Sequence, residues 1–461
     1  MGSPGPVRCI IPVLALFVVL QGVMLFYHSA VLDDMVGRNK IRRFLSKKGS
    51  FKIPPEDAQF GGPEVVPGMS EHIPEAATVK HAKVEVIAQD TRDRVQAAER
   101  PKVKELAPEA PESAEAQHNA TFCNASVTVY TPETDARCIA YLENTDNIAH
   151  IAPMASIMAL ARTIKYKVKY KSKHVKAILK VGQNNFPFEP YSEYLGFKID
   201  RLLGMDKVPP TGWVHLPIPV LNASLDVLTD QSFKDWVQTD VFEFPEVKKH
   251  LLHVAGVPHM PMSVQLWVAD IHPLQNTEWS VGGDWKSYFT PGSPADTPAL
   301  PHLSDIIVLD YILSNPDRRP DKNNYVAGGC RKDCQRRKGD LPHVGEVSLV
   351  PIDQGSSFYG PAPPDSNPLT PGSNSFCRFR RETAERVLKL KGDVSWSSYN
   401  KHSNSPFHKA VLRSLGPHED QILAVIKWQR IHWAQDRLNT LAAHIESCKQ
   451  RFGATRVTCW D

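Results

Sequence analysis

The alternation of apolar and polar positions divides the chain into three parts. Residues 9–27 form an uncharged apolar run, roughly as long as the ~20-residue helix that crosses a bilayer. Residues 32–118 are rich in Pro, Glu, Ala and Lys and poor in aromatic residues, which is typical of an extended linker. From residue 119 onward, runs of strand and helix length alternate with polar turns. These patterns predict a short tail (1–8), a membrane-spanning signal anchor (9–31), a disordered stalk (32–118) and one folded domain (119–461).

The folded domain begins with strand-like runs. In TIKYKVKYKSK, lysine alternates with other residues, and this period of two places ammonium groups on one face of a strand or hairpin. Two interpretations remain: an edge strand whose lysines prevent pairing with another sheet, and a basic platform for an acidic substrate. The lysines of this row are Lys165, Lys167, Lys169, Lys171 and Lys173.

A helix is predicted after the lysine row. Leu195, Ile199, Leu202 and Leu203 recur at helical spacing, and Gly204 followed by two prolines marks the end of the helix.

Further runs complete the pattern. MSVQLWVAD (262–270) predicts a buried strand, HLSDIIVLDYILSN (302–315) a buried helix, and EVSLVPID (346–353) a strand that ends in Asp. RETAERVLKL predicts a short amphipathic helix in which Glu382 and Arg386 pair at i, i+4.

Residues 418–450 predict a long final helix or a pair of helices. The order along the chain is therefore strands, one helix, a connecting strand and then mostly helices. This order predicts an α+β fold with a small β-rich lobe over about 119–262 and a larger helical lobe over about 270–461. A cleft between the two lobes is the expected place for a binding site.

The net charge and the glycosylation sequons indicate which partners and which compartment the domain has. The net charge is only +4, so no overall field attracts nucleic acid, and we expect no nucleic-acid partner. Asn119, Asn124 and Asn222 begin Asn-X-Ser/Thr sequons, which are glycosylation acceptors only in the lumen of the secretory pathway.

Cysteine spacing points in the same direction. The pairs Cys123/Cys138 and Cys330/Cys334 are close in sequence, as in small disulfide loops, although buried free thiols are the alternative.

Two sequence signals predict opposite orientations of the apolar run in the membrane. Basic residues gather over 38–48, and the positive-inside rule places that side in the cytosol, opposite to the sequons. A cleaved signal peptide is the alternative to an anchor, but the apolar run is longer than a usual signal core. We expect an uncleaved type II anchor with the folded domain in the lumen, and secretion after cleavage as the alternative.

Four charged residues stand in a suggestive order. Lys180 ends a predicted strand, Glu193 lies one turn into the following helix, Asp317 follows a buried helix, and Asp353 ends a strand before Gln354-Gly355. Taken singly, Lys180 and Glu193 indicate a surface ion pair, and Asp317 a turn-forming residue. Asp353 taken singly indicates a helix or turn cap. Together they suit phosphoryl transfer, in which one carboxylate accepts the proton of the attacking hydroxyl and the other ligates a metal. Asn323 or Asn324 would supply a neutral oxygen to a second metal ion.

Longer motifs carry a family resemblance. LDYILSNPDR resembles the LDYLxxNxDR element of the secretory-pathway kinases, the group of the Golgi casein kinase and the four-jointed kinase. SEYLGFKIDRLLGMDKVPPT is similar to the casein-kinase branch, whereas FCRFRRETAERVLKL and RLNTLAAHIESCK look more like four-jointed. The likeness covers roughly residues 150–450.

This resemblance implies an atypical bilobal kinase in the Golgi membrane that uses ATP with Mn or Mg. By resemblance, Asp317 is the catalytic base, Asp353 the metal ligand, Lys180 the phosphate contact, and Glu193 the support of lysine and metal. It also implies a disulfide between Cys377 and Cys448. The adenine-binding hinge implied in the same way comprises Gln265, Leu266, Trp267 and Val268.

The sequence departs from the family pattern in two places. Lys322 stands where the four-jointed pattern has Asn, and Asn323 and Asn324 follow it. A basic insert, CRKDCQRRKGD, separates the two catalytic carboxylates and reads as a solvated loop or as a reader of acidic substrate.

The expected function is a luminal kinase that phosphorylates Ser/Thr of secreted or cell-surface proteins, with acidic sequences as one class of substrate. Three alternatives remain: a glycan kinase of the xylose-kinase type, a pseudokinase that activates a partner, and a membrane-anchored glycoprotein whose Asp-rich loops bind Ca. All four charged residues are present, which favours an active enzyme over a pseudokinase.

Overall fold

The computed structural model describes residue 123 and residues 130–154, 163–269, 271–274, 288–293, 299–318, 322–328, 347–370, 376–392 and 405–460. All of them belong to one compact unit, Glu105–Asp461. The anchor, the stalk, Asn119, Asn124, Cys330, Cys334 and the basic insert lie outside the described residues, so these remain predictions. Among the described helices, none combines the length and apolarity that a bilayer crossing requires.

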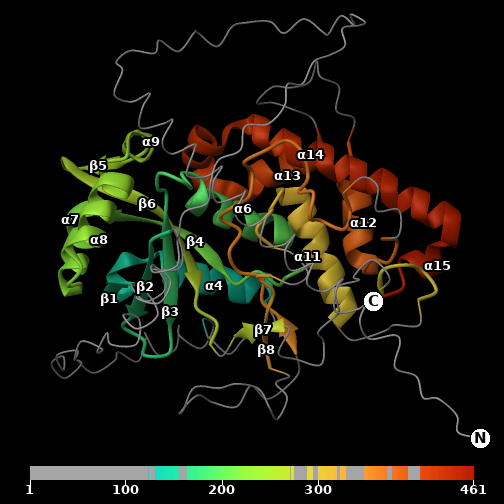
Figure 1. Ribbon diagram of the computed structural model, residues 1–461, viewed down its shortest axis with the longest axis horizontal. Coiled ribbons are helices and arrows are strands. Elements are labelled where there is room, and N and C mark those ends of the chain that lie inside the picture. Colours follow the sequence, from blue (N-terminus) through green and yellow to red (C-terminus); the bar gives the residue numbers. More distant parts are fainter. Residues whose placement is uncertain are drawn as a thin grey trace, which may run out of the picture. The chain divides into compact units, whose positions relative to one another are not determined.

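The smaller lobe is built on one antiparallel sheet (Figure 1). Its strand order is β1-β2-β3-β6-β4, and β5 pairs with the outer part of β6. The strands are β1 (Ile148–Pro153), β2 (Lys165–Tyr170), β3 (Lys176–Val181), β4 (Thr211–Pro217), β5 (Leu252–Val254) and β6 (Val257–Leu266).

The lysine row forms β2, and its pattern is the one expected for a strand. Tyr166, Val168 and Tyr170 are buried, while the lysines between them face the other side. The interpretation as an edge strand is wrong, because β2 lies between β1 and β3. The strand ends at Tyr170, so Lys171 and Lys173 fall in the turn that follows.

Helices α4 (Pro132–Glu143) and α6 (Glu189–Leu202) contact this sheet. The predicted helix is α6, and Gly204 ends it with a φ of 62°, a conformation that a side chain disfavours. Leu195 and Ile199 are fully buried, because α6 lies between the sheet and the helical lobe. The outer part of the lobe carries α7 (Ile218–Ser224), α8 (Gln231–Val237) and α9 (Pro245–Lys248).

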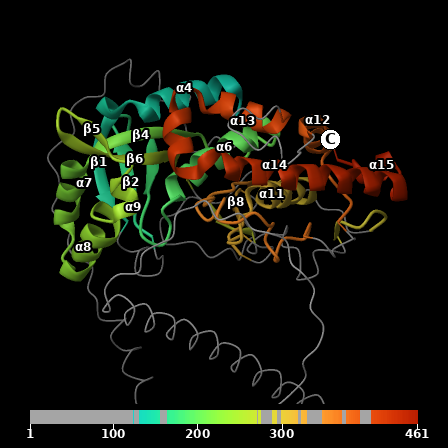
Figure 2. The ribbon, with the colours of Figure 1, turned by 90° about the horizontal axis from the view of Figure 1, so that it is seen from above.

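The larger lobe is mainly helical, and its longest helix, α14, contacts both α11 and α13 (Figure 2). Its helices are α11 (Ala299–Leu313), α12 (Arg381–Leu390), α13 (Pro406–Leu415), α14 (Glu419–Phe452) and α15 (Ala454–Val457). The predicted long helix is α14, kinked at Lys427, whose φ is 60°. In α12 the predicted pair is present, with Arg386 Nη2 2.8 Å from Glu382 Oε1.

A second small sheet joins β7 (His272–Pro273), β8 (Tyr325–Ala327) and β9 (Ser348–Leu349). The strand predicted over 346–353 is much shorter than expected. Of its residues that the structure describes, 347–353, two (Ser348 and Leu349) pair with β8, and the chain leaves the ladder before Asp353.

Two disulfides hold the described chain. Cys123–Cys138 ties the segment before α4 to that helix, and Cys377–Cys448 ties the segment before α12 to α14. The predicted α+β class is confirmed, with one apolar core under the sheet and a larger one among the helices. The apolar face of α6 belongs to the larger core, so α6 connects the two lobes.

Candidate active site

Lys180 lies at the centre of a buried charge cluster. Its Nζ on β3 donates to Glu193 Oε1 on α6, and it lies 2.9 Å from Asp353 Oδ1. Lys180 and Glu193 are almost fully buried. Burial would lower the pKa of Lys180, but Asp353 and Glu193 outweigh it and raise the pKa above its usual range. The structure therefore brings together three of the four residues that the sequence singled out.

A second lysine shares the same carboxylate. Lys165 lies opposite Lys180 in the β2–β3 register, and its Nζ is 3.0 Å from Asp353 Oδ1. Burial would raise the pKa of Asp353, but the two ammonium groups hold it well below its usual range, so Asp353 is ionised. Sequence reasoning placed Lys165 in a basic row but gave it no role in the site. Its alternation with buried residues was the available signal.

Glu189 is a carboxylate that sequence reasoning missed. It lies one turn before Glu193 on α6, and its Oε2 accepts a hydrogen bond of 2.7 Å from Gln183 Nε2. Burial raises the pKa of Glu189 to about 7, although Lys165 and Lys180 oppose this. The spacing of four residues between Glu189 and Glu193 was the signal, because it puts both side chains on one face of a helix.

Asp317 is held in a turn after α11. Its backbone N–H donates to Asn315 Oδ1 at 3.1 Å, which explains the Asn two residues earlier. Lys322 Nζ donates to Asp317 Oδ1, and Asn323 Nδ2 lies 3.0 Å from Asp317 Oδ2. Lys322, which departs from the family pattern, thus pairs with the proposed base.

Arg318 connects this turn to the segment of Asp353. Its guanidinium donates to Asp310 Oδ1 and to the carbonyl of Ile352, both at 2.6 Å. Burial raises the pKa of Asp310 to about 7, and Arg318 opposes that rise. Arg318, the residue after Asp317, thus binds Ile352, the residue before Asp353, through its buried side chain.

Part of the cluster of acids and lysines lines a cavity of about 450 Å³. Asp317 lines it from the helical lobe, Glu189 and Lys165 line it from the small lobe, and Asp353 lines it as well, whereas Lys180 and Glu193 lie behind Asp353 and do not line it. Gly355 also lines the cavity, and a Cβ at this position would lie 2.6 Å from Glu189 Cγ. A proton acceptor and a cluster of lysines and carboxylates therefore meet in one hollow.

The donor set suits a hard divalent cation. Glu193 Oε2 is buried and has no hydrogen-bond partner among the described residues. Both lysines contact Oδ1 of Asp353, and Glu189 adds a further carboxylate. Carboxylate oxygens are the ligands that Mg²⁺ and Mn²⁺ prefer, so the chemistry of Asp353 and the two glutamates suits such an ion, although oxygens of all three do not lie within 4.8 Å of one another.

Other predicted site residues lie elsewhere. Asn324 is buried, and its carbonyl accepts a hydrogen bond of 2.9 Å from the N–H of Leu274. Asn323 turns its amide nitrogen to Asp317. Neither asparagine lines the cavity.

Part of the main chain of the predicted hinge is already hydrogen-bonded to neighbouring strands and loops. The N–H groups of Leu266 and Trp267 donate to the carbonyls of Pro210 and Lys176, both at 2.9 Å. Gln265 donates to Thr211 Oγ1 at 3.1 Å. An adenine ring at this hinge would therefore use other main-chain groups than these two N–H groups.

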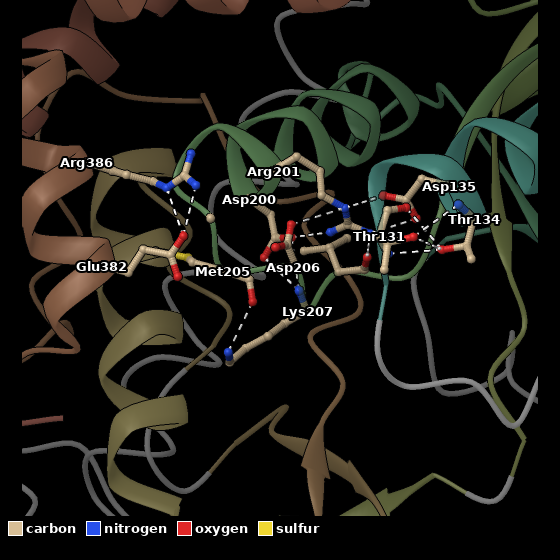
Figure 3. Close-up of polar contacts among 12 residues, drawn as sticks. Thr131, Thr134, Asp135, Asp200, Arg201, Met205, Asp206, Lys207, Glu382 and Arg386 are labelled. Carbon is tan, nitrogen blue, oxygen red and sulfur yellow. Dashed lines mark hydrogen bonds and ion pairs between the residues drawn. The ribbon is translucent and has the colours of Figure 1, made fainter. Parts of the chain in front are cut away.

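The far end of α6 is fixed by a charge network (Figure 3). Arg201 Nε lies 2.6 Å from Asp135 Oδ2, and its guanidinium also contacts Asp200. Burial raises the pKa of Asp200 to about 6, while Arg201 and Lys207 oppose the rise. Lys207 Nζ reaches Asp305 Oδ2 of α11 at 3.0 Å. This network ties the helix of Glu189 and Glu193 to both lobes.

Among known proteins, solved structures are similar to this chain over about three quarters of its length. No family model matches the chain, and no curated protein matches it. A crystal structure of the Golgi casein kinase is similar at 18% identity, with a TM-score of 0.44 over 71% of this chain and 80% of that one. Its structure with Mn/ADP bound has 17% identity and a TM-score of 0.44, over 71% of this chain and 78% of that one.

A structure of hydra Fam20 with sugar is also similar, at 14% identity and a TM-score of 0.44, over 74% of this chain and 97% of that one. Similarity at this level shows no activity, which depends on the side chains of the site.

Proposed function

We propose that this protein is a kinase that transfers the γ-phosphate of ATP to Ser/Thr hydroxyls of secreted or cell-surface proteins. One observation carries the proposal: lysines of two adjacent strands meet at Asp353, and Asp317 faces the same cavity. Cations beside a metal-binding carboxylate suit a triphosphate, and a separate carboxylate suits the acceptor hydroxyl.

Each residue has a distinct part in the proposed reaction. Lys180 and Lys165 bind phosphate oxygens, and Asp353 with Glu189 and Glu193 holds Mn or Mg. The metal, when bound, neutralises charge on the transferring phosphate. Asp317 accepts the proton of the hydroxyl, and Lys322 and Asn323 hold its carboxylate in place.

The proposed compartment is the Golgi lumen, with a single N-terminal anchor. Two disulfides among the described residues support an oxidising compartment. Asn222, the sequon within the described residues, is half-buried in α7, and its side chain accepts a hydrogen bond from Gln238. A glycan at Asn222 would therefore require that this contact open.

The test is phosphate transfer by the protein from a secretory host. It is incubated with labelled ATP, Mn or Mg, and casein-like, cadherin-like and xyloside acceptors. We expect transfer to a protein acceptor, and its loss in Asp353→Asn. The matched control is Asp365→Asn, which changes an exposed Asp of the same segment and should leave transfer intact. Transfer only to the xyloside would replace the protein substrate with a glycan, and nucleotide binding without any transfer would favour a pseudokinase.

A further inference from the structure

Arg437 of α14 is a buried cation with unusual partners. Its side chain makes three hydrogen bonds, all to main-chain carbonyls: Nε to Ile312 at 2.9 Å, and Nη1 to Gly360 at 3.2 Å and to Pro361 at 2.7 Å. Only 3% of the residue is exposed. Burial lowers its pKa to about 10, so the guanidinium stays charged without a carboxylate bonded to it among the described residues. Burying a charge is costly unless it is paired or hydrogen-bonded, and here the three main-chain carbonyls offset part of that cost.

The three carbonyls belong to the two segments that carry the proposed catalytic acids. Ile312 lies in the last turn of α11, five residues before Asp317. Gly360 and Pro361 follow Asp353 by seven and eight residues. One side chain of the last long helix therefore bridges the approach to Asp317 and the segment after Asp353.

The bridge also completes α11. The last carbonyls of a helix lack partners within it, and a cation at that end is favoured by the helix dipole. No basic residue lies in the last turn of α11, so Arg437 supplies that cation from another helix.

The bridged backbone is strained. Ser314, Asp353 and Phe358 have φ values of 56°, 70° and 66°, which side chains other than glycine rarely adopt. Such conformations persist only where surrounding bonds enforce them. Two bonds run beside the Arg437 bridge: the N–H of Phe358 donates to Leu313 at 3.0 Å, and Ser314 Oγ donates to Ala362 at 2.6 Å.

We propose that Arg437 is a positioning residue for phosphoryl transfer, because its guanidinium fork sets the spacing between the Asp317 turn and the Asp353 segment. Arg318 connects the same segments from within the Asp317 turn, whereas Arg437 connects them from α14. Lysine cannot replace it, since an ammonium is a point donor and does not reproduce a planar fork. This inference rests on the proposed kinase function.

The test compares Arg437→Lys with Arg451→Lys, an exposed arginine on the same helix. We expect Arg437→Lys to lower kcat at least tenfold with KM for ATP within about twofold, because the Asp317 turn shifts relative to the Asp353 segment while the two lysines still hold Asp353 and bind phosphate. Amide hydrogen exchange of residues 354–362 should rise at least tenfold, with β3 and α12 unchanged. The control should change none of these quantities.

Two outcomes would overturn the inference. One is unchanged kcat and unchanged exchange of 354–362 in Arg437→Lys. The other is faster exchange throughout the helical lobe with kcat and KM impaired together, which would mean a purely structural role. If the unmutated protein transfers no phosphate to any acceptor, the kinase proposal itself fails. The bridge is then judged by exchange alone, which needs no activity.

Discussion

At the scale of single residues, the two aspartates of the site have different surroundings. Asp353 contacts two lysines and is held ionised, as a metal ligand must be. Asp317 lies at the other wall of the cavity, where Lys322 and Asn323 contact its carboxylate oxygens. This difference separates binding from proton acceptance and allows each role to be tested alone.

Asp317→Ala should leave nucleotide binding near normal while removing transfer. The physical reason is that a general base acts mainly in the transition state, whereas in the ground state the lysines bind phosphate and Asp353 would hold the metal. The measurements are the thermal shift with ATP and Mn, and the transfer rate. Weak ATP binding together with residual transfer would contradict the assigned role.

Sequence order identified some of these residues and missed others. Lys180, Glu193, Asp317 and Asp353 stand out because each interrupts or ends an apolar run. Lys165 was indistinguishable from its neighbours in the row, since only the strand register shows which lysine lies opposite Lys180. Asn324 was a plausible ligand, but in the fold it directly precedes β8, where it is buried and its carbonyl accepts from the N–H of Leu274.

At the scale of elements, α6 is the helix on which the site depends. Gly196 lies on its face toward Gln354, the residue after Asp353, and a Cβ there would lie 2.9 Å from Gln354 Cγ. Gly196→Ala should push α6 and the Asp353 segment apart, with a loss of about 1–3 kcal/mol in unfolding free energy and reduced transfer. Denaturant unfolding measures the first quantity.

Gly360→Ala is the control for this prediction, because no atom lies within 4 Å of the added Cβ. Equal stability of the two variants would show that α6 does not pack as closely on Gln354 as the structure indicates.

The Cys377–Cys448 bond fastens α14 to the segment before α12. Cys377→Ser should lower the free energy of unfolding by roughly 2–5 kcal/mol, since the bond closes a long loop in the unfolded chain. The melting temperature without reductant is the measurement. Cys459, which is free, provides the control, and Cys459→Ser should melt like the unmutated protein.

At the scale of the whole molecule, the buried His408 makes stability depend on pH. His408 and His432 are fully buried on α13 and α14, with ring centroids 4.4 Å apart. Burial lowers the pKa of His408 to about 4, and the facing His432 adds to this effect. The folded state therefore holds His408 neutral, whereas the unfolded chain takes up a proton below about pH 6.5.

The part of the stability that depends on neutral His408 is therefore fully present above about pH 6.5 and is lost as the pH falls toward 4. Between pH 7.5 and pH 5, we expect His408 to lower the free energy of unfolding by about 1–2 kcal/mol. Glu189 and Asp310, whose pKa values burial raises, change stability in the opposite direction, so the His408 contribution is measured by comparing variants at the two pH values. His408→Phe should remove this loss, while His253→Phe, at an exposed position, should not. An equal pH dependence in His408→Phe would contradict the assignment.

The sequence by itself determined the α+β class, helices α6, α11, α12 and α14, and four residues of the candidate site. It could do so because apolar periodicity and turn residues are local signals, and charges that interrupt apolar runs are conspicuous. Helix α6 and its end at Gly204 were predictable for the same reason. The sequence missed helix α4 before the strands, and the elements between α6 and β6.

Only the tertiary structure decided which residues meet. Strand register selected Lys165, helical phase turned Glu189 toward the cavity, and α14 brought Arg437 to carbonyls more than seventy residues away. It also showed that two hinge N–H groups are already bonded within the sheet. These features depend on contacts between distant segments, and no local pattern in the chain encodes a long-range distance.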